Sequence, residues 1–106
     1  MHSGNPVPFE RHLEKLTGPM KAVMVDLRGF VLAIGSNVIE EVRPHRVVYS
    51  KTMNFRTFLD IEPAGDLLVV AIRYGRSAPP ITVTVRNEQD LEEAKSRIAE
   101  AYQKIQ

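Results

Sequence analysis

The sequence predicts an α+β fold, a four-stranded antiparallel meander with N-terminal and C-terminal helices packed on one face. A helical repeat of apolar residues spans about 19–34, and a second repeat follows Asn87. Between them lie segments rich in β-branched residues and joined by short links. Because short links join antiparallel neighbours, and each helix buries only one stripe, the helices are expected to cover one face of the sheet.

The composition is that of one soluble globular domain. The chain has 106 residues, of which 43% are apolar and 25% are charged. No apolar run approaches the ~20 residues that cross a bilayer, and no secretory signal is visible, so we expect a cytoplasmic protein. The absence of cysteine excludes disulfides, thiol catalysis and thiolate metal sites.

The beginning of the chain is expected to be an arm followed by a short helix. Residues 1–8 contain one glycine and two prolines and are predicted to be a flexible arm, which leaves 9–106 as a single domain. Phe9, Leu13 and Leu16 recur at helical spacing, which predicts a short helix around 9–16.

The repeat at about 19–34 is the strongest helical signal in the chain. Pro19 suits the first turn of this helix, and Gly35 suits a C-terminal cap. The segment Val38–Val42 could form one further helical turn, because Ser36-Asn37 could cap its start and Pro44 would end it.

Four strands are expected in the middle of the chain. Val47–Tyr49 is β-branched and aromatic, and Phe55–Glu62 alternates in polarity. A turn at Pro63–Asp66 leads into the apolar run Leu67–Ile72, which predicts a central strand buried on both faces. In Ile81–Val85, apolar residues alternate with threonines, which indicates a strand that is wet on one face and near an edge.

The last element is expected to be a helix. Asn87 is a suitable N-cap, and Glu88 and Asp90 place negative charge in the first turn, where it complements the helix dipole. The buried stripe is predicted to consist of Leu91, Ala94, Ile98, Ala101, Tyr102 and Ile105.

Positive charge is concentrated in residues 43–56, which contain no acidic residue. Because side chains alternate along a strand, Arg46 and Lys51 must lie on opposite faces, and only the ends of the strands can gather the charge. The third strand's end contributes two further arginines. The predicted ligand-binding rim consists of Arg43, His45, Arg46, Tyr49, Lys51, Asn54, Arg56, Arg73 and Arg76.

This rim predicts a non-enzymatic binding or accessory module for an anionic partner, either nucleic acid or an acidic protein surface. Tyr49, Phe55 and Tyr74 could provide stacking platforms for bases. The alternatives are a solvated sheet edge, where positive charge deters aggregation, and pairing with the acidic final helix of the same molecule.

No catalytic residues, metal ligands or cofactor motif are predicted. The histidines are scattered, and the glycines do not form a phosphate-binding loop. An alternative is a small enzyme that uses His45 with Tyr49, Asp60 or Glu62. Another is a structural homodimer that pairs through the fourth strand or through an exposed part of the stripe Met20–Ile34.

Four segments together resemble a known family. They are V-I-E-E-V-R-P-H-R-V-V-Y, N-F-R-T-F-L-D-I-E-P, L-L-V-V and D-L-E-E-A-K-S-R-I-A-E-A-Y, and the resemblance spans about residues 20–105. The family is a small α+β family of unknown function, sometimes labelled "predicted transport protein". The resemblance implies an accessory binding role, whereas transport finds no support in a chain without a membrane span. The connection R-Y-G-R-S-A-P-P is shorter than is usual in the family and lacks tryptophan.

Overall fold

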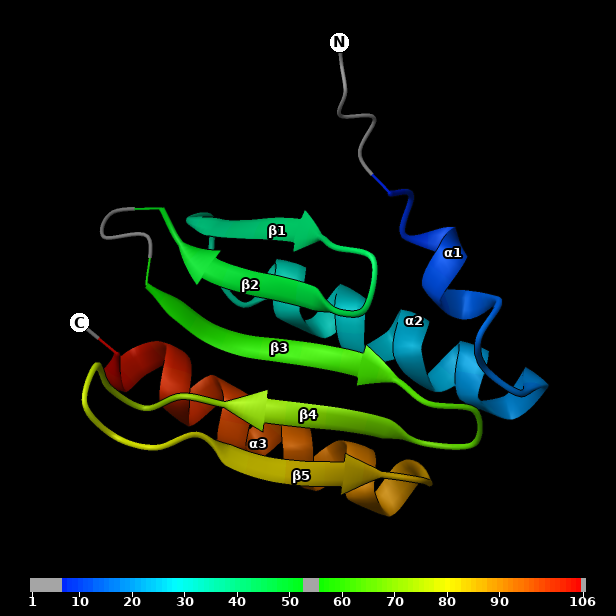
Figure 1. Ribbon diagram of the computed structural model, residues 1–106. Helices are drawn as coiled ribbons and strands as arrows, with labels where there is room; N and C mark the ends of the chain where they lie inside the picture. Colours follow the sequence, from blue (N-terminus) through cyan, green and yellow to red (C-terminus); the bar gives the residue numbers. More distant parts are fainter. Residues whose placement is uncertain (1–6, 53–55, 106) are drawn as a thin grey trace, which may run out of the picture.

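The computed structural model describes residues 7–52 and 56–105, which form a five-stranded sheet and three helices (Figure 1). The helices are α1 (Glu10–Leu13), α2 (Gly18–Ala33) and α3 (Glu88–Lys104). The strands are β1 (Val38–Val42), β2 (Val47–Lys51), β3 (Thr57–Pro63), β4 (Leu68–Ile72) and β5 (Ile81–Val85). They lie in chain order, each antiparallel to the next, which confirms the predicted meander and places β1 and β5 at its edges.

The meander has five strands and not four, because the predicted helical turn at Val38–Val42 is strand β1. This segment contains three β-branched residues, and it pairs along its whole length with β2, from Val38 opposite Lys51 to Val42 opposite Val47. Pairing with β2 satisfies its backbone, which an isolated helical turn could not do.

Helices α2 and α3 cover the same face of the sheet, as predicted, and they leave the other face open (Figure 1). Their bounds agree closely with the sequence patterns, and Asn87 caps α3 by accepting a 2.8 Å hydrogen bond from the backbone N–H of Asp90. The first helix is shorter than predicted, four residues in place of about eight. In the described part of the chain, no helix is both long and apolar enough to span a bilayer.

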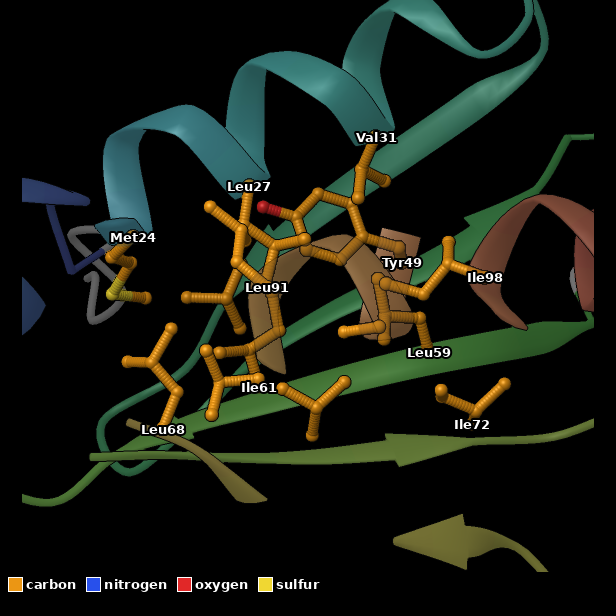
Figure 2. Packing of buried hydrophobic residues seen from close by; sticks show 14 of the residues in the cluster. Met24, Leu27, Val31, Tyr49, Leu59, Ile61, Leu68, Ile72, Leu91 and Ile98 are labelled. Carbon is orange, nitrogen blue, oxygen red and sulfur yellow. The ribbon is translucent and has the colours of Figure 1, made fainter. Parts of the chain in front are cut away.

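The hydrophobic core lies between the two long helices and the sheet (Figure 2). The predicted stripe of α3 is buried there, although Tyr102 is only half-buried. Each central strand contributes alternate residues, and Figure 2 shows many of these apolar side chains gathered beneath α2. The largest fully buried apolar side chains are Tyr49, Phe58, Met24, Leu27, Leu59, Ile61, Leu68, Ile72, Leu91 and Ile98.

The strand β4 does not fit the expectation of burial on both faces. Leu68, Val70 and Ile72 are buried beneath the helices, whereas Val69 and Ala71 are half-buried on the open face. The continuous apolar run therefore reflects a central position in the sheet, and no second layer built from the described residues covers it.

A bulge in β3 also changes the predicted alternation. Tyr49 pairs with Leu59 and Ser50 pairs with Thr57, so Phe58 is an extra residue. Phe58 and Leu59 are both fully buried as a result, and the Phe58 ring packs edge-on against Tyr102 of α3. Thr57 consequently lies on the open face, where its hydroxyl is 3.1 Å from that of Ser50.

Gly35 does not act as the left-handed cap that the sequence suggests. Its φ is not positive, and the C-cap of α2 is Ile34. Gly35 instead lies directly against the hydroxyl of Tyr102, which donates a hydrogen bond to Asn37. The side chain of Asn37 therefore accepts a hydrogen bond from α3, and the helix cap predicted at this point is wrong.

Candidate binding surface on the sheet

The residues of the predicted rim do not form one surface. Arg43, His45 and Arg46 lie at the hairpin between β1 and β2, which is closed by a 2.9 Å hydrogen bond from the N–H of Arg43 to the carbonyl of Arg46. Lys51 lies at the opposite end of β2. A strand of five residues separates the two ends by about 17 Å.

Lys51 and Tyr49 face the helices. The Lys51 ammonium donates to the carbonyl of Ile105 at 3.2 Å and lies 4.4 Å from the ring centroid of Tyr102. Tyr49 is fully buried, and Figure 2 shows its ring among the apolar side chains beneath α2. Neither side chain is available to a ligand on the open face.

The remaining rim residues lie apart. Asn54 is outside the described residues. Arg56 is half-buried and has an interaction partner, and Arg76 is exposed in the loop between β4 and β5. Arg73 directly follows β4 and donates its backbone N–H to the carbonyl of Phe58.

The helix-free face of the sheet, defined by Val48, Ser50, Asp60, Glu62, Val69, Ala71, Thr82 and Thr84, brings part of the rim together. On this face Asp60 lies between Val48 of β2 and Ala71 of β4. Arg46 precedes Val48 by two residues, and Arg73 follows Ala71 by two, so strand alternation places both arginines on this face.

Arg46 and Arg73 flank Asp60. The Arg46 guanidinium is 3.8 Å from Oδ1 of Asp60 and 3.7 Å from Oε1 of Glu62. The Asp60 side chain is only 13% exposed. Burial raises the pKa of Asp60, and the positive charges of Arg46 and Arg73 oppose that shift without cancelling it.

Among the described residues, the guanidinium groups of Arg46 and Arg73 have no hydrogen-bond acceptor. The distances from Arg46 to the two carboxylates exceed hydrogen-bond length, and neither guanidinium donates a hydrogen bond to any described residue. Each planar fork can therefore receive a carboxylate or phosphate of a ligand. Arg43 differs, because it donates to Glu41 at 2.9 Å.

The basic hairpin is not paired with the acidic final helix. The carboxylates that meet it come from β1 and β3, namely Glu41, Asp60 and Glu62. Two of the acidic residues of α3, Glu93 and Glu100, pair with Arg97 and Lys104 of the same helix.

The residues of the enzyme alternative do not converge. His45 is exposed at the hairpin, whereas Tyr49 is buried under the opposite face from Asp60 and Glu62. Across the described ranges, no three histidine or carboxylate side chains are grouped so that they could hold a metal ion.

Two buried polar contacts were not found from the sequence. Glu40, interpreted there as part of a helical turn, accepts hydrogen bonds from Tyr49 and from Arg28 of α2. His12 is fully buried, and its Nε2 lies 2.7 Å from the carbonyl oxygen of Arg43. An assignment of β1 as a strand would have placed Glu40 opposite Tyr49, whereas nothing in the sequence indicates the contact of His12.

Comparison of the chain with protein-family models, with curated proteins and with solved structures found no match. The resemblance to a small α+β family therefore stays a prediction, and the function is inferred from the geometry alone.

Proposed function

We propose that this protein is a non-enzymatic binding module whose helix-free face binds an acidic segment of a partner protein. The observation that carries the proposal is the pair Arg46 and Arg73, which flank Asp60 and whose guanidinium groups donate no hydrogen bond to any described residue. The planar guanidinium of an arginine can donate two parallel hydrogen bonds to one carboxylate. The sheet fixes where each arginine lies, at the end of its strand.

The composition of the face favours a protein partner over nucleic acid. Val48, Val69 and Ala71 supply an apolar middle, and arginines border it, as in many protein interfaces. The carboxylates of Asp60 and Glu62 lie in the same area and would repel carboxylates and phosphates alike, so the preference for a protein partner rests on the apolar middle of the face.

Two of the predicted stacking platforms also point away from this face. Tyr49 is buried in the core, and the Tyr74 hydroxyl donates to Glu100 of α3 at 3.0 Å. Phe55, the third, lies outside the described residues. Base stacking, on which single-stranded nucleic acid binding depends, therefore gains no support from Tyr49 or Tyr74.

Fluorescence anisotropy with a labelled glutamate-rich peptide tests the proposal, with single-stranded and duplex oligonucleotides as parallel probes. The protein should bind the peptide at low salt, and Arg46→Gln/Arg73→Gln should weaken binding about tenfold or more. Binding should also weaken as the salt rises from about 50 to about 200 mM, because the contacts are between exposed charges.

Arg97→Gln/Lys104→Gln is the matched control. It removes two positive charges from the helical side, where Arg97 pairs with Glu93 and Lys104 pairs with Glu100, and should leave binding unchanged. An equal loss from this control would show that only net charge matters. Absence of peptide binding at low salt, or tighter binding of an oligonucleotide that depends on Arg46 and Arg73, would overturn the choice of partner.

A further inference from the structure

The edge strand β5 is unprotected. Among the described strands its one neighbour is β4, and its residues Ile81–Val85 include no charge and no proline. Ile81 is 40% exposed although it is a large apolar residue. The other edge strand, β1, carries Glu40 and Glu41, and charges of this kind deter pairing with another chain.

The hydrogen bonds of the sheet show which backbone groups of β5 point outward. Consecutive residues of an antiparallel strand turn their N–H and C=O groups to alternate sides. Arg73 donates its N–H to Phe58 of β3, and Ala64 accordingly donates to Leu67 across the turn. The odd-numbered residues of β4 therefore face β3, and its even-numbered residues face β5.

The outward groups of β5 are those of Thr82 and Thr84. The even-numbered residues of β4 pair with Ile81, Val83 and Val85, so these three turn their backbone groups toward β4. The two threonines alternate with them and present their N–H and C=O groups to the open edge.

We propose that β5 pairs antiparallel with β5 of a second copy of this chain, about a two-fold axis at Val83. Thr82 then lies opposite the partner's Thr84, and each threonine exchanges both backbone hydrogen bonds with its counterpart. This isologous contact joins two five-stranded sheets into one and closes both exposed edges at once.

The neighbouring registers satisfy fewer groups. A shift that sets Thr82 opposite its own copy places Thr84 against Pro80, which has no N–H to donate. A shift in the other direction requires the N–H of Arg86, which already donates to Asp90 at 3.0 Å. The register centred on Val83 is thus the one in which both outward threonines are fully paired.

The side chains agree with this register. Ile81 lies opposite the partner's Val85 on the helical side, and Val83 lies opposite its own copy, so β-branched residues meet across the new pair. The axis stands perpendicular to the sheet, so the helix-free faces of both copies lie on the same side. The pairing uses the backbone edge of β5 and does not involve Arg46, Arg73 or Asp60, so it is independent of the proposed function.

Sedimentation velocity over a roughly hundredfold range of protein concentration tests the pairing, because dimerisation follows mass action. The wild-type protein should shift from monomer to dimer. Thr82→Lys/Thr84→Lys places lysine opposite lysine at two positions and should weaken dimerisation about tenfold or more.

Thr82→Lys/Thr84→Glu is the matched variant, since it sets each lysine opposite the partner's glutamate and should restore the dimer. Both changes are on the helix-free face, and circular dichroism confirms that each variant is folded. A wild-type protein that stays monomeric throughout overturns the proposal. A Lys/Glu variant that dimerises as weakly as the Lys/Lys variant overturns the register.

Discussion

The hydroxyl of Tyr49 donates a 2.8 Å hydrogen bond to Oε2 of Glu40, the residue directly opposite it on β1. The same carboxylate receives two further 2.8 Å hydrogen bonds from Arg28 of α2. Burial acts to raise the pKa of Glu40, but the hydrogen bonds from Arg28 and Tyr49 outweigh it, and the pKa lies below its ordinary value. One ionised carboxylate therefore joins a helix to two strands.

Removal of the tyrosine hydroxyl should weaken this junction without breaking it. Tyr49→Phe keeps the buried ring and leaves Arg28 to hold Glu40, so the free energy of unfolding should fall by about 1–2 kcal/mol. Urea denaturation measures the change.

Glu41→Gln is the control for that substitution. Glu41 is next to Glu40 but exposed, and its ion pair with Arg43 is on the surface, so its loss should change stability much less than Tyr49→Phe does. A Tyr49→Phe variant as stable as the wild-type protein would mean that the hydroxyl contributes nothing to the junction.

The sequence predicts those parts of the fold that depend on periodicity. The repeats predict where the helices α2 and α3 and the strands after Arg46 lie, whereas the burial of β4 and the bulge of β3 depart from the repeats. Strand β1 was missed because Val38–Val42 is short, carries two glutamates and follows a good helix cap. Only pairing with β2 decides its conformation, and that is a contact between segments.

The candidate surface could be predicted only in part, for the same reason. Strand alternation correctly separates Arg46 from Lys51 and places Asp60 and Glu62 on one face. It cannot show that Arg46 reaches Asp60, because this depends on the register between β2 and β3. The burial of Tyr49 depends on which face the helices cover, and no local pattern contains that information.

Asp60 should be replaceable at neutral pH without loss of stability. Its pKa is raised in the folded protein, mainly by burial, so ionisation disfavours folding above that pKa. The wild-type protein should therefore gain stability from this group as the pH falls through the folded pKa toward the ordinary value. Asp60→Asn removes this gain, and its free energy of unfolding at about pH 7 should be no lower than that of the wild type.

Denaturation at several pH values checks this expectation. A marked loss of stability in Asp60→Asn at neutral pH would show that the ion pair with Arg46 outweighs burial. The same variant leaves Arg46 and Arg73 without their central negative charge, and it should bind the glutamate-rich peptide more tightly than the wild-type protein.

His12 should make the attachment of α1 sensitive to acid. Its Nε2 is the donor to the carbonyl of Arg43, and its Nδ1 is buried without a partner among the described residues. Burial lowers the pKa of His12, the contact with Arg43 opposes this, and the charges of Lys15 and His45 add to the lowering. A lowered pKa means that this contribution to stability is full above about pH 6.5 and is lost as the pH falls toward the folded pKa.

His12→Gln tests this point, because glutamine keeps a donor but does not titrate. The variant should show a flatter dependence of the unfolding free energy on pH between about pH 7 and pH 5. Parallel curves for the two proteins would mean that His12 is not the group responsible.

Gly35 should tolerate no side chain, because the Tyr102 hydroxyl occupies the place of its Cβ. In Gly35→Ala the methyl group must displace Tyr102, which donates to Asn37 and packs on Phe58. We expect the free energy of unfolding to fall by about 1–3 kcal/mol, as for other overpacked sites.

Gly29→Ala is the matched control, since no atom lies within 4 Å of its Cβ position in α2, and alanine should stabilise that helix by about 0.5–1 kcal/mol. Thermal unfolding of both variants measures the opposite shifts, and a Gly35→Ala variant as stable as the wild type would show that Tyr102 moves aside at little cost.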